Sequence, residues 1–158
     1  MKKLLLIRHA KATHETGFID FERPLQESGL HDAAIMAGRL KEKNLIPQIL
    51  VASPALRTLS TANVFSQHLA ISQAQINKDI YEATTLSLIK VINALPDEHD
   101  FIALVGHNPG ISDLLYYLTR QLQDVSTCAM MLIEFDTDSW MEIIEDAGKL
   151  VYYDYPKS

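Results

Sequence analysis

The chain has 158 residues, 47% of them hydrophobic, which predicts a single globular domain with a full core. Its formal net charge of −6 argues against a general surface for nucleic acid or for an anionic membrane, so an anion site must be a local group of basic side chains. Cys128 is the only cysteine, and no stretch approaches the ~20 apolar residues of a membrane helix. We therefore expect a cytoplasmic protein without disulfides.

The apolar run at residues 4–7 leads directly into Arg8 and His9. A short run of this kind predicts a strand buried on both faces, with Arg8 and His9 at its carboxyl end. Ligands bind at that edge of open α/β sheets. An imidazole beside a fixed cation is a candidate nucleophile toward an anionic electrophile, and the alternative is an ordinary surface pair at a strand end.

A loop, a helix and a second strand follow. Residues 13–21 show no period and predict a loop, and residues 28–43 carry an apolar stripe at helical spacing, with Ser28 as the expected cap. Residues 49–52 form another apolar strand.

The next helix starts beside a third basic residue. Ser53 is its expected cap and Pro54 falls in its first turn. Arg57 lies close behind, where the helix dipole disfavours a cation unless an anion binds at the same end.

The central part of the chain repeats the opening arrangement. Residues 76–81 predict a short strand or an extended segment that ends at Glu82, and Thr84 or Thr85 is expected to cap the following helix. Residues 101–105 are the clearest buried strand, and they run into Gly106-His107-Asn108 and a helix over about 111–122.

The tail has a different pattern. Residues 129–135 and 140–144 are β-like runs on either side of a hairpin signal, and residues 150–155 predict a last strand. The alternation of strands and helices before them predicts a mainly parallel sheet between helical layers, an αβα sandwich with an antiparallel C-terminal strand or hairpin.

Parallel strands would bring Arg8, His9, Arg57 and His107 to one edge of the sheet. Two guanidiniums and two imidazoles suit a phosphoryl group, because arginine binds phosphate oxygens with two parallel hydrogen bonds. In the rival interpretation the two histidines bind zinc, but such a site usually needs a third protein ligand, and the arginines would repel the ion. We expect no metal and no cofactor.

Three motifs carry a resemblance to a known family. Arg8-His9-Ala10, Ser53-Pro54-x-x-Arg57-Thr58-x-x-Thr61-Ala62 and Gly106-His107 resemble the signatures of the histidine phosphatase superfamily. Asp20-x-x-Arg23-Pro24-Leu25-x-x-x-Gly29 is similar to the small SixA-type phosphohistidine phosphatases. The resemblance implies a phosphoglycerate mutase-like fold over residues 1–158, as one domain without a cap insertion.

The resemblance also implies a role for each site residue. His9 attacks phosphorus as a neutral ring and forms a phosphohistidine intermediate, which water then hydrolyses. Arg8 and Arg57 hold the phosphoryl oxygens, and a protonated His107 donates to the same group. The backbone N–H of Asn108 is a further candidate donor.

The choice of substrate depends on the leaving group. An ester expels an alkoxide unless an acid protonates it, whereas imidazole leaves more easily because its conjugate acid has a pKa of ~6.5. Glu82 is the first candidate for that acid, with a surface or capping role as the alternative, and Asp20 and Glu15 are weaker candidates. Lys11 and His14 either contact the substrate or are solvated.

The segment after His9 departs from the mutase pattern, since Ala10 and Lys11 stand where mutases have Gly and a carboxylate or amide. An uncovered groove would admit a folded phosphohistidine protein from a two-component relay or a sugar phosphotransferase system. The alternatives are a small-molecule phosphomonoesterase that takes a phosphorylated metabolite and a non-catalytic phosphoprotein-binding module. We expect no nucleic-acid or membrane partner.

Overall fold

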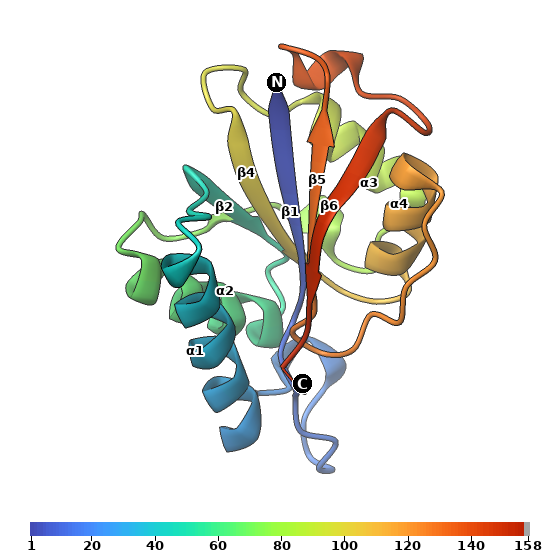
Figure 1. Ribbon diagram of the computed structural model, residues 1–158. Helices are drawn as coiled ribbons and strands as arrows, with labels where there is room; N and C mark the ends of the chain where they lie inside the picture. Colours follow the sequence, from blue (N-terminus) through green and yellow to red (C-terminus); the bar gives the residue numbers. More distant parts are fainter. Residues whose placement is uncertain (157–158) are drawn as a thin grey trace.

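The computed structural model describes residues 1–156. A six-stranded sheet lies between two helical layers, with α1 and α2 on one face and α3 and α4 on the other (Figure 1). The strands are β1 (Lys2–Arg8), β2 (Ile49–Ala52), β3 (Gln75–Ile76), β4 (Phe101–Gly106), β5 (Met130–Phe135) and β6 (Gly148–Asp154). The helices are α1 (Glu27–Glu42), α2 (Leu56–Leu69), α3 (Thr85–Asn93) and α4 (Gly110–Thr119), with 3-10 turns η1 (Asp20–Glu22), η2 (Lys78–Ile80) and η3 (Trp140–Glu142).

The strand order is β3-β2-β4-β1-β5-β6. Strands β1 to β4 are parallel, whereas β5 pairs antiparallel with both β1 and β6. The predicted sandwich with a mainly parallel sheet and antiparallel C-terminal strands is therefore confirmed.

The continuous apolar run of β1 follows from its burial on both faces. Leu4 and Leu6 pack in the half of the core that contains residues of α3 and α4, whereas Leu5 and Ile7 pack in the half that contains residues of α1 and α2. Successive side chains of a strand point to opposite faces, so a central strand needs apolar residues at every position.

The register of the sheet positions the candidate residues. Arg8 pairs with Gly106 across β1 and β4, so His9 and His107 follow directly on neighbouring strands. Ala52 pairs with Val105, which brings Ser53 to the same edge. All three strand ends therefore meet.

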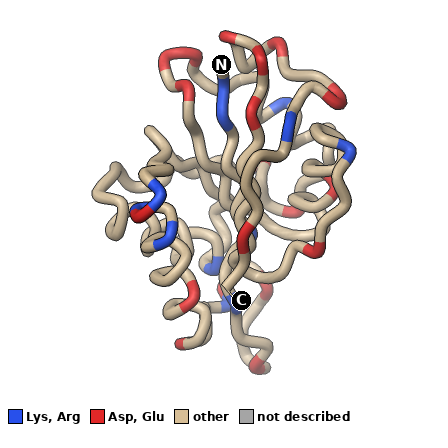
Figure 2. Tube along the Cα trace, viewed as in Figure 1, with Lys and Arg blue, Asp and Glu red and all other residues tan. Residues whose placement is uncertain are grey.

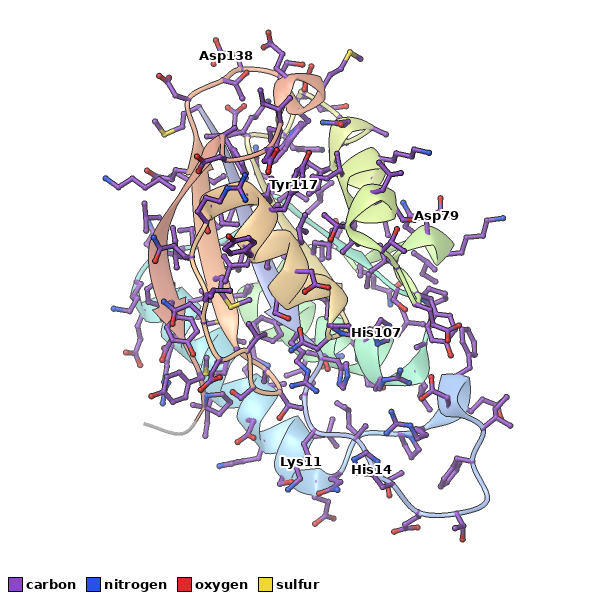
Figure 3. The ribbon with its side chains drawn as sticks, turned by 90° about the vertical axis from the view of Figure 1, so that its right-hand side faces the viewer. Lys11, His14, Asp79, His107, Tyr117 and Asp138 are labelled. Carbon is purple, nitrogen blue, oxygen red and sulfur yellow. The ribbon has the colours of Figure 1, made fainter. Side chains whose placement is uncertain are left out.

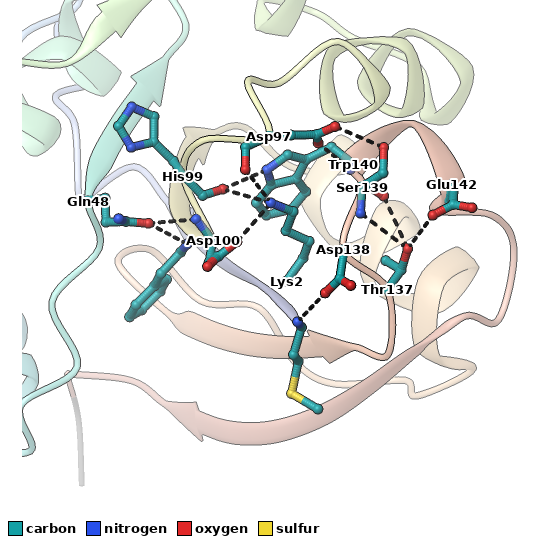
Figure 4. Close-up of polar contacts among 12 residues, drawn as sticks. Lys2, Gln48, Asp97, His99, Asp100, Thr137, Asp138, Ser139, Trp140 and Glu142 are labelled. Carbon is teal, nitrogen blue, oxygen red and sulfur yellow. Dashed lines mark hydrogen bonds and ion pairs between the residues drawn. The ribbon is translucent and has the colours of Figure 1, made fainter.

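Polar contacts fix the opposite end of the sheet (Figure 4). The Lys2 side chain is 1% exposed, and its Nζ donates to the Asp100 carboxylate at 2.8 Å and to the Asp97 carbonyl at 2.7 Å. The same ammonium lies 5.6 Å from the ring centroid of the fully buried Trp140. Because the charge has close partners, its burial is tolerated. Figure 2 shows acidic residues along the loops at this end.

Two predicted caps are wrong. Gln26, not Ser28, precedes α1, because the Gln26 carbonyl already accepts the first helical hydrogen bond, from the Leu30 N–H at 3.1 Å. Ala55 precedes α2, and Ser53 lies two residues before that cap, where its Oγ accepts from the Ala55 N–H at 3.2 Å. Thr84 does cap α3, as predicted.

Two predicted strands are also wrong in part. Of the first, residues 76–81, only Ile76 belongs to a strand, because the Asn77 side chain accepts from the Asp79 N–H and starts the turn η2. Residues 140–144 form no strand, because the Asp97 carboxylate accepts from the Trp140 N–H at 2.8 Å and holds the turn η3. The partner of β5 is β6, the predicted last strand, and α4 ends at Thr119, before a left-handed Arg120.

Candidate active site

A cavity of about 370 Å³ lies at the end of β4, the edge of the sheet where β1 and β2 also end. His107 lines this cavity (Figure 3), and the His9 ring lies next to it, with its centroid 5.4 Å from that of His107, although His9 itself is not among the lining residues. The residues that line the cavity come from the start of α2, from the end of η2 and the segment after it, from α3, and from the end of β4 through the start of α4: Arg57, Ile80, Tyr81, Glu82, Ala83, Leu88, Gly106, His107, Asn108, Pro109, Gly110 and Ile111.

His9 is held as a neutral imidazole with one free ring nitrogen. Its Nδ1 lies 2.7 Å from the Ala10 carbonyl oxygen, which can only accept, so Nδ1 carries the proton and Nε2 keeps its lone pair. Burial, together with the charges of the nearby Arg57 and Arg8 guanidiniums, lowers the pKa of His9 to about 4, although the hydrogen bond to Ala10 opposes the shift. At neutral pH, Nε2 is therefore available as a nucleophile.

Backbone contacts on three sides fix His9. Its N–H donates to the Gly106 carbonyl at 3.0 Å, and its carbonyl accepts from the Cys128 N–H at 3.0 Å. The Thr61 Oγ1 accepts from the Ala10 N–H at 2.9 Å and donates to the Arg57 carbonyl at 2.7 Å. Thr61 thus joins the residue after the nucleophile to the helix that carries Arg57.

Arg8 and Asn108 share an anchor. The Arg8 Nη1 donates to the Val125 carbonyl at 2.9 Å, and the Asn108 Nδ2 donates to the same oxygen at 3.1 Å. The Asn108 Oδ1 accepts from the Ser112 N–H, so its side chain is engaged in the β4–α4 turn. Its backbone N–H stays a candidate donor to a ligand.

Arg57 is 6% exposed and is bound to the turn η1. Its Nη1 donates to the Asp20 carbonyl at 2.7 Å, and its Nη2 donates to the Asp20 Oδ2 at 3.1 Å. Within residues 1–156, three buried side-chain nitrogens have no hydrogen-bond partner, and all three belong to this site: Arg8 Nε, Arg57 Nε and His107 Nδ1. Such atoms are costly, and a bound anion would supply their partner.

His107 contacts Ser53 and Tyr81. Its Nε2 lies 2.8 Å from the Ser53 Oγ, and its ring meets the Tyr81 ring edge-on at 5.5 Å. Burial lowers the pKa of His107 to about 3, and the charge of Arg57 adds to this shift. The protonated His107 expected from the sequence therefore requires an anion in the cavity.

The candidate acids and substrate contacts occupy different places. Glu82 is exposed and lines the cavity, so it stays a candidate for the acid. Asp20 is ionised, because a hydrogen bond from Tyr81 and the Arg57 guanidinium lower its pKa to about 2, and it cannot donate a proton near neutral pH. Lys11 and His14 are exposed on the segment after β1 and do not line the cavity (Figure 3).

Three residues of the site were not predicted individually. In the sequence, Thr61 stood out only as part of the motif that contains Arg57, and Tyr81 only as the residue before Glu82. Arg23 donates through Nη1 to the Thr13 carbonyl at 2.9 Å and through Nε to the Asp20 Oδ1 at 3.2 Å, which ties the first loop to the site. The spacing of Asp20 and Arg23 was the signal that pointed to this pair.

In the described part of the chain, no three His, Cys, Asp or Glu side chains form a group that could hold a metal ion. None of the helices over residues 1–156 has the length and apolar character that a membrane span requires.

Residues 4–85 match the family model of the histidine phosphatase superfamily (branch 1), and the match includes Arg8, His9 and Arg57. The chain belongs to this superfamily. An uncharacterised protein of Mycobacterium tuberculosis is 29% identical over 143 residues, which are 90% of this chain and 88% of that protein. A phosphoglycerate mutase of Bifidobacterium longum is 39% identical over 67 residues only, 39% of this chain and 26% of the mutase.

Solved structures confirm the fold of this superfamily member. A structure described as the protein histidine phosphatase SixA with tungstate has a TM-score of 0.85 at 20% identity and covers 98% of this chain and 97% of that chain. One from Agrobacterium tumefaciens, provisionally named phosphohistidine phosphatase SixA, has a TM-score of 0.83 at 22% identity and covers 98% of both chains. The expected resemblance to the SixA-type fold is confirmed.

Proposed function

We propose that this phosphatase removes the phosphoryl group from a phosphohistidine protein through a covalent intermediate on His9. The observation that carries the proposal is the set of three buried, unpartnered nitrogens around a neutral imidazole whose Nε2 is free. A phosphoryl group would meet these nitrogens and stand in front of the nucleophile.

The reaction has two displacements. The His9 Nε2 forms a bond to phosphorus while the bond from phosphorus to the substrate nitrogen breaks, and that nitrogen keeps the electron pair. Water then attacks the phospho-His9, which releases phosphate and regenerates the free Nε2. His107 gains a proton as the anion enters and donates to the transferring oxygens, and Arg8 and Arg57 balance their charge. No step requires a metal.

The substrate belongs to the proposal as well. The proteins similar in fold include two whose structures are described as SixA, and this chain covers 98% and 97% of their length, which supports a substrate of the same kind. We expect phosphohistidine carriers of the two-component or sugar phosphotransferase type, in the cytoplasm. The second candidate is a small-molecule phosphomonoesterase, which the position of Glu82 at the cavity favours.

Labelling tests the covalent step. Brief exposure to phosphoramidate, followed by alkaline quenching and peptide mass spectrometry, should place an acid-labile phosphoryl group on His9. The His9→Ala protein should carry no label, whereas His31→Ala, which changes an exposed histidine of α1, should label normally. Full turnover by His9→Ala, or tight phosphate binding without hydrolysis by the wild type, would contradict the proposal.

Substrate comparison separates the two candidates. Wild type and Glu82→Gln are assayed with a phosphohistidine protein and with alkyl phosphates. A phosphohistidine phosphatase should prefer the protein and lose little activity in Glu82→Gln, because imidazole leaves without an acid. A preference for alkyl phosphates, with a loss of at least about tenfold in Glu82→Gln, would identify a phosphomonoesterase.

A further inference from the structure

The carboxylate of Asp20 is fixed beside the catalytic cavity by three elements. Its Oδ2 accepts from the Tyr81 hydroxyl at 2.7 Å and from the Arg57 Nη2 at 3.1 Å. Its Oδ1 accepts from the Arg23 Nε at 3.2 Å. Tyr81 and Arg57 both line the cavity, so this anion lies at its rim with its side chain 52% exposed.

Asp20 is a permanent charge and not a proton donor. The Tyr81 hydrogen bond and the Arg57 and Arg23 guanidiniums together keep its pKa at about 2. Tyr81 is held by the same bond and packs edge-on against both Phe21 and His107. The carboxylate therefore cannot turn away without breaking contacts that also position the wall of the cavity.

The charges around the cavity suit one phosphoryl group only. The cations are the guanidiniums of Arg8, Arg57 and Arg23, and the two imidazoles are neutral. Asp20 and the cavity-lining Glu82 are carboxylates on the solvent side. A phosphoryl dianion balances the positive charge of these guanidiniums. A second anionic group on the substrate would then lie near the Asp20 and Glu82 carboxylates, which repel it.

An in-line displacement places the leaving group across phosphorus from the His9 Nε2. Glu82 lines the cavity and Asp20 is bound to the cavity-lining Tyr81 and Arg57, and both carboxylates are exposed, so we expect the leaving group to depart near them. A phosphorylated imidazole departs as neutral imidazole when its other ring nitrogen already carries a proton. That protonated ring is a cation, and a nearby carboxylate favours it.

We propose that Asp20 determines specificity by favouring a cationic phosphoimidazole ring and by disfavouring substrates with a second anionic group. This inference rests on the proposed phosphoryl transfer to His9 and adds the charge of the leaving group to it. Besides Asp20, the charged and titratable groups that contact its carboxylate or line the cavity are Arg57 from α2, Arg23 from the first loop, and Tyr81, Glu82 and His107.

The test compares two small probes on one variant. Phosphoimidazole carries the cationic ring, and phosphoglycolate carries a second anion. In Asp20→Asn, the ratio of kcat/KM for phosphoimidazole to that for phosphoglycolate should fall about tenfold, the effect of one unit charge a few ångströms away in a partly solvated site. The pH at which the phosphoimidazole rate declines should also shift downward, because the protonated ring loses its counter-charge. Loss of Arg57 positioning alone would lower both rates and leave the ratio unchanged.

Glu22→Gln is the matched control, because Glu22 is an exposed carboxylate of the same turn η1. It should leave the ratio within twofold of the wild type. Binding of both probes to His9→Ala, measured by calorimetry with and without Asp20→Asn, tests the charge preference apart from turnover. A binding ratio that Asp20→Asn does not change overturns the inference, whereas absent labelling of His9 overturns only the proposed function.

Discussion

The Oγ of Ser53 lies 2.8 Å from the Nε2 of His107, and both groups stand at the ends of neighbouring parallel strands. Ser53 is fully buried and also accepts from the Ala55 N–H. A hydroxyl can donate to a neutral imidazole or accept from an imidazolium. Ser53 therefore suits His107 in both protonation states and positions its ring.

Removing this hydroxyl should impair catalysis more than folding. In Ser53→Ala, kcat/KM should fall about 10- to 100-fold, because a hydrogen bond to a charged group is worth roughly 1.5–3 kcal/mol. The basic limb of the pH profile should shift to lower pH, since the His107 imidazolium loses an acceptor and gives up its proton more easily. Steady-state kinetics across pH provides the measurement.

Ser66→Ala is the control for that change, because Ser66 is a buried serine of α2 whose Oγ donates to the Asn63 carbonyl. It should leave the pH profile unaltered. Equal kinetic losses in both variants would show that the Ser53 effect is merely structural.

Gly29 supports the nucleophile from α1. A Cβ at this position would lie 2.3 Å from the Lys11 carbonyl oxygen, which is backbone and cannot move aside without displacing the segment after His9. We expect Gly29→Ala to lower the free energy of unfolding by about 3 kcal/mol and to reduce activity. Denaturant unfolding together with kinetics checks both effects.

Gly38 provides the matched substitution on the same helix. A Cβ there meets no atom within 4 Å, so Gly38→Ala should stabilise the protein by about 0.5–1 kcal/mol through helix propensity. A loss of stability in Gly38→Ala comparable to that in Gly29→Ala would contradict the packing argument.

The two histidines of the site, His9 and the half-buried His107, make the free energy of unfolding fall in acid. The pKa of His9 is about 4 and that of His107 about 3, against 6.5 in an unfolded chain, so the unfolded state binds more protons below pH 6.5. The free energy of unfolding should therefore drop between pH 6.5 and 4, by roughly 2 kcal/mol for each histidine. Above pH 6.5 this contribution is fully present and constant.

Urea titrations at pH 7 and pH 4.5 measure this difference. His107→Asn should show a smaller drop than the wild type, whereas His68→Asn, at an exposed position of α2, should show the same drop. The Asp20 carboxylate does not contribute to the difference between pH 7 and pH 4.5, because its lowered pKa affects the free energy of unfolding only below about pH 4. If the free energy of unfolding fell by the same amount in His107→Asn as in the wild type, protonation of His107 would not be a cause of the fall.

The strands that lead into the candidate site residues could be predicted from the sequence, because each strand is marked by a pattern of its own residues. The apolar runs before Arg8, Ser53 and His107 predict buried parallel strands, and parallel pairing then dictates that their ends meet. The apolar runs are local features of the sequence, and the observed register of β1, β2 and β4 confirms that the strand ends meet.

The errors have a common physical origin. Residues 140–144 were predicted as a strand from β-like composition, but the Asp97 carboxylate, more than forty residues earlier, holds the Trp140 N–H in a turn. The contact of Asp20 with Arg57 joins residues 37 positions apart. No local pattern contains such partners, so the roles of Tyr81 and Asp20 became visible only in three dimensions.

Thr61 links the nucleophile to the phosphate-binding helix, and its hydroxyl can be removed without changing the shape of the side chain. Thr61→Val leaves the buried Ala10 N–H without its acceptor, which should cost about 1–3 kcal/mol of unfolding free energy. It should also lower kcat, because the segment after His9 loses its tie to Arg57. Thr61→Ser keeps the hydroxyl and should retain most of the activity, so kinetics and thermal unfolding of the two variants separate the hydrogen bond from packing. If Thr61→Ser were as impaired as Thr61→Val, the methyl group and not the hydroxyl would be the functional part.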